Sequence, residues 1–191
     1  DLSRIICDTL NYNNIKLEDD DVLVLAETVV SKAEGNYVKI EDVVVSDKAK
    51  DISLKSEKDA KQCQIILDNR SARCIKKYLD EVFDVDVSVI ISDTQGRPWR
   101  VGAVGVAIGI SGIHPCTDFR GSSDLYGQEL MSTIEGTADE LASAASLVMG
   151  QSDNGICLVL IRGYDNSLVK CAIDEASISE SIRDEETDVF R

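Results

Sequence analysis

Asp93 and Thr94 are the strongest candidates for a reactive site in this sequence. They follow an apolar strand predicted over residues 85–91 and open a polar, glycine-containing turn that also carries Arg97 and Arg100. Magnesium and manganese prefer oxygen ligands and usually bridge to substrate phosphates. A carboxylate beside a hydroxyl at a strand end therefore suits a metal-bound phosphate, with two guanidiniums close by. The alternative is that Asp93 caps the turn through its own backbone.

The region around this pair differs in charge from the rest of the chain. Residues 92–121 contain three arginines and two aspartates, whereas the whole sequence has 35 acidic and 20 basic side chains. The same region holds half of the 12 glycines. Glycine lets backbone amides approach a ligand without interference from a Cβ atom. Together these features predict an anion-binding site.

Two other segments are candidates for that site. Ser31 and Lys32 follow a strand predicted over residues 22–30, and a lysine just beyond a strand end can neutralise a phosphate. The glycine-rich run of a phosphate-binding loop is missing before Lys32, so a solvated surface lysine is the alternative. The polar loop at residues 149–156 is suited to wrap a nucleotide, or it only connects a helix to a strand.

The composition excludes several classes of partner. A formal net charge of −15 argues against nucleic acid and against an anionic membrane surface, because both need a basic face. The longest apolar runs are too short and too rich in glycine to span a bilayer. With 43% apolar and 29% charged residues, the chain is expected to fold as a single domain over residues 1–191. Since no bilayer-spanning run is seen, we expect the protein in the cytoplasm.

Hydrophobic periodicity predicts a mixture of helices and strands. Helices are expected over residues 2–10, 46–53, 55–83 with a break near 69–71, and 133–149. Strands are expected over residues 22–30, 36–40, 85–91, 101–110 and 156–161. In the helix over 133–149, Asp139 and Glu140 are expected to point away from the core. The expected core-facing residues of that helix are Ile134, Ala138, Leu141, Ala145 and Val148.

Ordered sequence blocks along nearly the whole chain resemble one known family. The blocks are Val-Val-Ser-Lys-Ala-Glu-Gly at 29–35, Val-Ile-Ile-Ser-Asp-Thr-Gln-Gly-Arg-Pro-Trp-Arg at 89–100, Val-Gly-Val-Ala-Ile-Gly at 104–109, Asp-Leu-Tyr-Gly at 124–127, Ala-Asp-Glu-Leu-Ala at 138–142, Leu-Val-Met-Gly at 147–150 and Asp-Glu-Glu-Thr-Asp-Val-Phe-Arg at 184–191. They are similar to the coenzyme F420-0:γ-glutamyl ligase family. So many blocks in the same order make chance similarity a poor explanation.

The resemblance implies a ligase that adds L-glutamate to the phospholactyl carboxylate of coenzyme F420-0, a deazaflavin, during coenzyme F420 biosynthesis. It implies GTP as co-substrate, a divalent metal (Mn²⁺ or Mg²⁺) and a monovalent cation such as K⁺. The carboxylate would attack the γ-phosphate to give an acyl phosphate, which the glutamate amine would then displace. With the resemblance, we expect an α+β fold in which helices flank a mixed β-sheet, as in γ-glutamyl ligases, and an intertwined homodimer.

The resemblance also assigns roles to individual residues. Asp93 and Arg97 are expected to be catalytic, and the metal is expected at Asp93, Thr94 and Gln151. GTP contacts are expected at Thr28, Ser31, Lys32, Met149, Gly150, Gln151, Ser152, Asp153, Asn154, Gly155 and Ile156.

The chain departs from the family pattern in several places. The family's first strand is missing before Asp1, and its Asn-Ala-Gly-Ile-Asp block, which supplies a metal-ligating aspartate, is missing between Ser71 and Ala72. Gln151 stands where the family has a glutamate ligand, and Ser122 stands where it has an arginine. Either the protein has lost the internal block, or the sequence omits flexible residues and joins their flanks. We favour omission.

Two other functions stay open at this point. Loss of the aspartate block together with Gln151 would suit an impaired homologue that acts as a nucleotide-binding or scaffold protein. A related ligase that activates another carboxylate would keep the same site chemistry.

Overall fold

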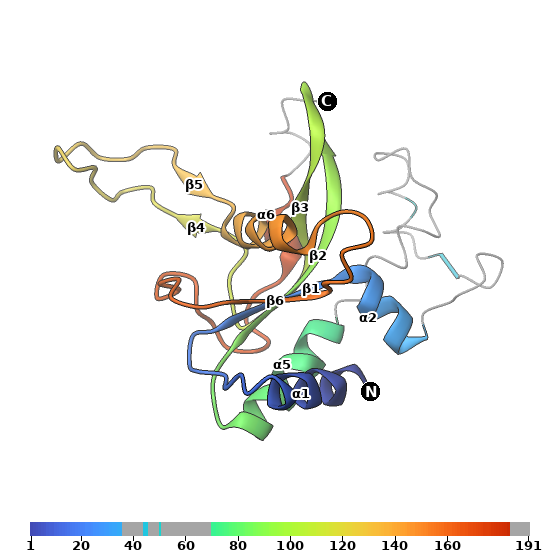
Figure 1. Cartoon of the computed structure of the whole chain (residues 1–191). Helices are drawn as coiled ribbons and strands as arrows, with labels where there is room; N and C mark the ends of the chain where they lie inside the picture. Colours follow the sequence, from blue (N-terminus) through green and yellow to red (C-terminus); the bar gives the residue numbers. More distant parts are fainter. Residues whose placement is uncertain (36–43, 46–49, 51–69, 184–191) are drawn as a thin grey trace.

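A four-stranded mixed sheet forms the centre of the molecule (Figure 1). The computed structural model describes residues 1–35, 44–45, 50 and 70–183. The strand order is β3-β2-β1-β6, with β1 (Val22–Ala26) parallel to β2 (Ser88–Arg97) and antiparallel to β6 (Leu158–Ile161). β3 (Arg100–Ser111) pairs antiparallel with β2. The predicted α+β class with a mixed sheet is confirmed.

Helices cover both faces of this sheet. α1 (Leu2–Tyr12) and α5 (Arg70–Phe83) lie on one face, and α6 (Thr137–Met149) lies on the other (Figure 1). Strand residues alternate between the two layers, so Leu23 packs toward α1 and α5, whereas Val24 packs toward α6. Burial on both faces explains why β1 is an unbroken apolar run.

The β2–β3 hairpin extends beyond the rest of the sheet. Pairing of β1 with β2 ends at Ala26 and Ser92, so residues 93–97 pair only with β3. Figure 1 shows the two strands continuing upward together past β1. Trp99 makes the turn at the tip with a φ of 63°.

A second, smaller arm leaves the body between β3 and α6. β4 (Thr117–Asp118) and β5 (Ile134–Glu135) pair at its base, and the connecting loop projects to the left in Figure 1. Large apolar side chains on this loop are exposed, among them Leu125, Tyr126 and Met131. A short 3₁₀ helix, η2 (Ile178–Ser181), begins with a capping box at Ser177.

Within the described parts of the chain, no helix combines the length and the apolar character that a membrane crossing requires.

Several predicted boundaries were wrong. The strand predicted over 22–30 ends at Ala26, where α2 (Glu27–Glu34) begins, because an apolar run alone does not separate a strand from a helix. The strand that contains Asp93 continues to Arg97 instead of ending at residue 91. α5 begins at Arg70, and residues 51–69 lie outside the described residues, so the predicted break near 69–71 stays a prediction.

The α6 prediction was right in its centre and wrong at its start. The helix begins at Thr137, and Ile134 belongs to β5 and is half exposed. Ala138, Leu141 and Ala145 are buried as predicted, but Val148 is exposed. The strand predicted over 36–40, most of the helix over 46–53 and the first part of that over 55–83 lie outside the described residues.

Candidate active site

A cavity of about 470 Å³ lies where β1 and β2 end their parallel pairing. Its walls come from the end of β1, the start of α2, the exposed part of β2 and the loop that follows α6. Residues that are far apart in the sequence meet here because both strands of the parallel pair deliver their carboxyl ends to the same edge. Such edges are common ligand sites in α/β proteins.

Most of the predicted site residues line this one cavity. They are Thr28, Lys32, Asp93, Thr94, Met149, Gly150, Gln151, Ser152, Gly155 and Ile156. Four predicted residues do not line it, namely Ser31, Arg97, Asp153 and Asn154. The Ser31 hydroxyl donates instead to the Glu27 carboxylate on its own helix. Arg97 lies four residues beyond Asp93, which is about 13 Å along an extended strand.

Asp93 and Lys32 supply opposite charges that the fold leaves available. Asp93 is exposed on β2, and Lys32 lies in the last turn of α2. Among the residues that the structure describes, neither side chain has a hydrogen-bond or ion-pair partner. No side chain caps the start of α2, so the backbone N–H groups of its first turn add positive potential at the same edge. This arrangement suits an anion accompanied by a cation.

A hydrogen bond across the cavity joins β2 to the loop after α6. The Thr94 hydroxyl donates to the carboxamide oxygen of Gln151 at 3.0 Å. The loop leaves α6 through Gly150, which has a φ of 72° and lies against the side chain of Asn154. A Cβ at this position would overlap that side chain, so the turn requires glycine. The prediction that Gly150 ends this helix is confirmed.

Two further hydrogen bonds fix α6 against β3. Asp139 accepts from the backbone N–H of Ala107 at 2.8 Å, and the Ser143 hydroxyl donates to the Gly105 carbonyl at 2.7 Å. Gly105 is the cross-strand partner of Thr94. The expectation that Asp139 points away from the core was wrong, because its carboxylate binds the neighbouring strand. These contacts hold the loop after α6 opposite Thr94.

The donor atoms in the cavity suit a hard divalent cation. Asp93 offers a carboxylate, Thr94 a hydroxyl and Gln151 an amide oxygen, and magnesium and manganese prefer oxygen. In the described residues, no group of three or more His, Cys, Asp or Glu side chains is placed to hold a metal. A cation here would therefore take part of its coordination from a bound phosphate or from water.

Sequence reasoning missed several residues that line the cavity. Glu27, Ser92, Ser146 and Cys157 all contribute to its wall. Glu27 was placed inside a predicted strand, so its position at a helix start gave no signal. Ser146 lies on a helix with no local motif, and only the packing of α6 on the sheet brings it here.

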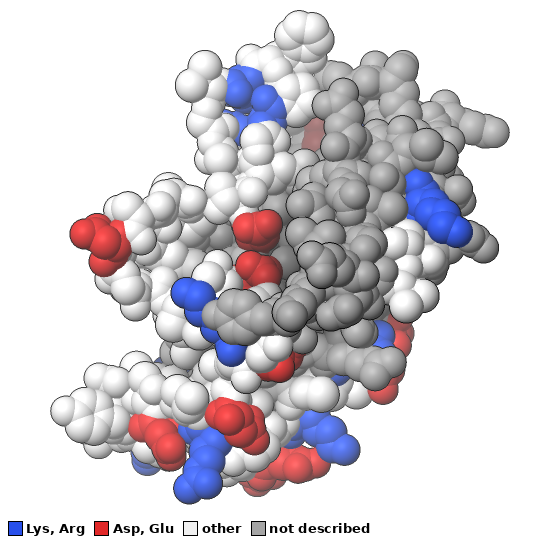
Figure 2. Space-filling view, turned by 90° about the vertical axis from the view of Figure 1, so that its right-hand side faces the viewer, with Lys and Arg blue, Asp and Glu red and all other residues white. Residues whose placement is uncertain are grey.

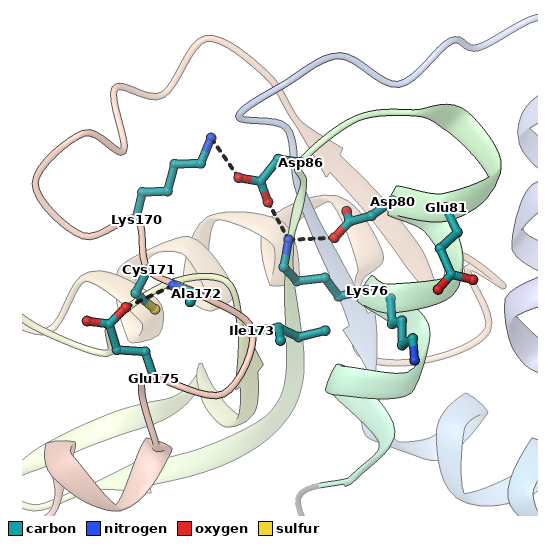
Figure 3. Close-up of a pocket in the computed structure, with 10 residues that line it drawn as sticks. Lys76, Asp80, Glu81, Asp86, Lys170, Cys171, Ala172, Ile173 and Glu175 are labelled. Carbon is teal, nitrogen blue, oxygen red and sulfur yellow. Dashed lines mark hydrogen bonds and ion pairs between the residues drawn. The ribbon is translucent and has the colours of Figure 1, made fainter.

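A second hollow, of about 540 Å³, lies beside α5 (Figure 3). The buried Lys76 ammonium donates to Asp80 at 2.8 Å, to Asp86 at 2.5 Å and to the Val87 carbonyl at 2.7 Å. These three acceptors use all three of its donor hydrogens. Lys170 pairs with Asp86 from the other side at 3.1 Å.

Lys76, Lys170, Asp80 and Asp86 thus pair with one another in this hollow. Burial by itself raises the pKa of Asp86, but hydrogen bonds from Lys76 and Lys170 outweigh burial and hold that pKa below its ordinary value. The network ties α5 to the start of β2. We interpret it as structural, in contrast to Asp93 and Lys32, which have no partner among the described residues.

Basic side chains gather at the β2–β3 tip. Figure 2 shows Lys and Arg side chains near the top of one face, at the height of this tip in Figure 1, whereas acidic and basic side chains are mixed lower on that face. Arg97 and Arg100 are cross-strand partners at this tip, and both are exposed. Two of the three arginines of the predicted basic segment thus lie at the hairpin tip, Arg120 lies on the β4–β5 arm, and none of the three lines the cavity.

Comparisons with known proteins give one consistent result. A family model described as F420-0:Gamma-glutamyl ligase matches residues 1–71 and 68–163. A protein of Methanothermobacter thermautotrophicus named Coenzyme F420:L-glutamate ligase is 36% identical over an alignment of 236 residues, covering 100% of this chain and 92% of that protein. Proteins with the same name from Methanopyrus kandleri and Methanocaldococcus jannaschii are 36% and 35% identical, covering 100% and 92% of this chain and 91% and 86% of their own lengths. The chain belongs to the F420-0:γ-glutamyl ligase family.

Proposed function

We propose that the chain is a GTP-dependent ligase that adds L-glutamate to coenzyme F420-0. The observation that carries the proposal is the cavity at the end of β1 and β2, which gathers Asp93, Thr94, Lys32 and the loop after α6. The relatives' shared name, Coenzyme F420:L-glutamate ligase, supports the choice of substrates. Lys32 has no partner among the described residues, and no side chain caps the first amides of α2, which supports a phosphate ligand.

The proposed reaction has two steps, and both fit these side chains. The substrate carboxylate attacks the γ-phosphorus of GTP, forming an acyl phosphate and releasing GDP. The glutamate amine then attacks the acyl carbon, an amide forms, and inorganic phosphate leaves with the displaced electron pair while the amine loses a proton. Lys32 and the start of α2 would stabilise phosphate charge. Asp93, Thr94 and Gln151 would hold a divalent cation, which supplies further charge neutralisation when bound.

Arg97 remains a predicted catalytic residue in this proposal. Its place at the hairpin tip, outside the cavity wall, means that it would act only if substrate or a second subunit extends toward the tip. A monovalent cation such as K⁺ and the remaining GTP contacts at Ser31, Asp153 and Asn154 are likewise proposals.

We infer a homodimer from exposed apolar side chains on the two projecting arms. Trp99 and Val101 on the β2–β3 hairpin and Leu125 and Tyr126 on the β4–β5 arm are each at least 89% exposed. Large apolar side chains gathered on projecting segments are typical of surfaces covered by another chain. Light scattering of the purified protein should give twice the chain mass, and a monomer at micromolar concentration would contradict the inference.

The family match supports the proposed interruption near Ser71. The two matched segments overlap at residues 68–71, and the alignments with the Methanothermobacter and Methanopyrus proteins each span 236 positions, 45 more than the 191 residues of the chain. We propose that the relatives carry a block here that has no counterpart in this sequence. The uninterrupted gene sequence across Ser71 and Ala72 would decide between loss and omission.

The test of the proposed function is direct. Purified protein with GTP, Mn²⁺, L-glutamate and coenzyme F420-0 should raise the coenzyme mass by one glutamyl unit and release GDP in equal amount. Asp93→Asn should reduce this rate by about 10²–10³-fold, because one preorganised charge partner is lost. Asp8→Asn, on the exposed face of α1, should leave it unchanged.

One observation favours a second candidate, a nucleotide-binding protein without turnover. Gln151 offers a neutral amide at a position where a carboxylate would bind a hard cation more strongly. GTP binding that depends on Mn²⁺ and on Asp93, with no change in coenzyme mass, would favour this candidate. GDP release with a different carboxylic acid would instead indicate a related ligase.

A further inference from the structure

A β-bulge interrupts the β2–β3 hairpin at the level where the cavity begins. Ile91 on β2 pairs with Gly109, and the next residue, Ser92, pairs with Ala107. Ile108 is therefore the extra residue of the bulge. Ser92 is also the last residue of β2 that pairs with β1, and it lines the cavity. Bulges change the direction of the side chains that follow them and are common beside active sites.

The bulge decides which side chains of β3 face α6. Ala107 and Ile110 both pack in the layer that contains α6, although residues three apart in a regular strand face opposite sides. Ile108 packs in the opposite layer, with α1 and α5. Without the bulge, the alternation would continue from Ile110 and turn Val106 toward α6 in place of Gly105. A valine does not fit there, because even a Cβ at Gly105 would overlap with the α6 backbone.

Asp139 binds the backbone beside the bulge. Its carboxylate accepts the N–H of Ala107 at 2.8 Å, and Ala107 directly precedes Ile108. A bulge disrupts the strand ladder locally, so this side chain from α6 supplies an acceptor where strand pairing is irregular. Hydrogen bonds to a carboxylate are stronger than those between neutral groups. Asp139 thus ties the start of α6 to the bulge itself.

From Asp139, α6 leads to the loop that meets Thr94. One turn along the helix, the Ser143 hydroxyl donates to the carbonyl of Gly105, the cross-strand partner of Thr94. Beyond the end of the helix, Gln151 accepts the Thr94 hydroxyl at 3.0 Å. A change at the bulge would therefore move β3 relative to the helix that carries this loop.

We propose that Asp139 is a positioning residue for the candidate active site, an inference that rests on the proposed function. By holding the bulge at Ile108, Asp139 fixes which face of β3 meets α6. It thereby places the loop at residues 149–156, which is expected to contact GTP, opposite Thr94. Asp139 lies outside the set of residues that line the cavity, so its effect on the reaction is transmitted through the bulge and α6.

NMR of the full chain tests this positioning without any substrate. Asp139→Ala should speed amide hydrogen exchange of Ala107 about tenfold, because a hydrogen bond to a charged acceptor is lost. It should also shift the amide signals of Thr94 and Gln151. Asp139→Asn should resemble the wild type, because its amide oxygen can accept the same N–H. Ser111→Ala is the matched control, since it removes a buried hydrogen bond from the other end of β3.

Steady-state kinetics of the ligation reaction separates positioning from stability. Asp139→Ala should raise the KM for GTP about tenfold and change kcat less, because the displaced loop is expected to bind the nucleotide. Asp139→Asn should restore the KM. Ser111→Ala should leave both constants unchanged, although it also lowers thermal stability. Thermal unfolding verifies that each variant is folded.

The outcomes separate this inference from the proposed function. Faster exchange of Ala107, shifted Gln151 signals and a raised KM in Asp139→Ala, with rescue by Asp139→Asn, support the inference. Equal changes in Ser111→Ala would overturn it, because a general loss of stability would then explain them. Unchanged Gln151 signals in Asp139→Ala would also overturn it and leave the ligase proposal intact. Absence of turnover in the wild type would overturn the proposed function, whereas the spectra would still test the position of the loop.

Discussion

Gly105 on β3 lies against the backbone carbonyl of Ala142 on α6, so closely that a Cβ atom at Gly105 would come within 2.6 Å of that oxygen. Thr94, which lines the cavity, is the cross-strand partner of Gly105. The contact between Gly105 and Ala142 therefore links the packing of α6 to the geometry of the cavity. A backbone carbonyl in a helix does not move aside as the end of a flexible side chain does. The fold therefore depends on glycine at this position.

Gly105→Ala should lower the free energy of unfolding by about 1–3 kcal/mol, the usual cost of overpacking. Urea denaturation provides the measurement. Gly96→Ala is the matched control on the same hairpin, because a Cβ there meets nothing within 4 Å. Equal stability of the two variants would show that α6 does not approach β3 as described.

Lys32→Gln should weaken GTP binding about tenfold, because a charged hydrogen-bond donor to phosphate is lost. Calorimetry with Mn²⁺ and GTP provides the affinity. Lys77→Gln removes the same charge from the wall of the second hollow and should have no effect. A loss of GTP affinity in Lys77→Gln, with no loss in Lys32→Gln, would place the phosphate beside α5.

Modification of Cys157 should report whether the cavity is occupied. This cysteine is exposed and lines the cavity, whereas Cys74 is exposed on α5 and does not. GTP with Mn²⁺ should slow alkylation of Cys157 by iodoacetamide and leave Cys74 unchanged, as measured by peptide mass spectrometry. Unchanged modification of Cys157 at saturating nucleotide would argue that GTP binds elsewhere.

Acid should weaken the network around Lys76. The pKa of Asp86 is lowered in the folded protein, since hydrogen bonds from Lys76 and Lys170 outweigh burial. Its ionised form thus stabilises the fold above the unfolded carboxyl pKa, about 3.9, and this contribution is lost as the pH falls through the lower folded pKa.

The corresponding variant is Asp86→Asn. The difference in unfolding free energy between wild type and variant should be largest near neutral pH and should shrink on acidification. It should stay modest, because the Asp86 side chain is 53% exposed. Asp8→Asn on α1 should show no such pH dependence, and a difference for Asp86→Asn that is constant with pH would contradict the assignment.

The sequence predicted which residues meet at the cavity better than it predicted their secondary structure. Asp93, Thr94 and Lys32 were identified from their positions after apolar runs, and they do lie together. Their secondary structure was assigned incorrectly, because Val29 and Val30 favour a strand by composition although the chain turns into α2 at Glu27. At the end of β2, pairing with β3 prolongs the strand through the polar residues 93–97.

Long-range contacts account for what the sequence did not reveal. The Asp139 carboxylate meets Ala107 only because α6 packs on β3, and residues 107 and 139 share no local pattern. The bond between Thr94 and Gln151 spans 57 positions in the sequence. The buried network of Lys76 gave no signal at all, since a lysine in an amphipathic helix is normally expected to be exposed.

The most direct measurement of the central claim is anomalous scattering from crystals of the full chain soaked with Mn²⁺ and GTP. The account predicts a manganese peak beside Asp93 and Thr94, with the triphosphate approaching Lys32 and the start of α2. A peak in the hollow beside Lys76, or ordered nucleotide with no metal near Asp93, would contradict it.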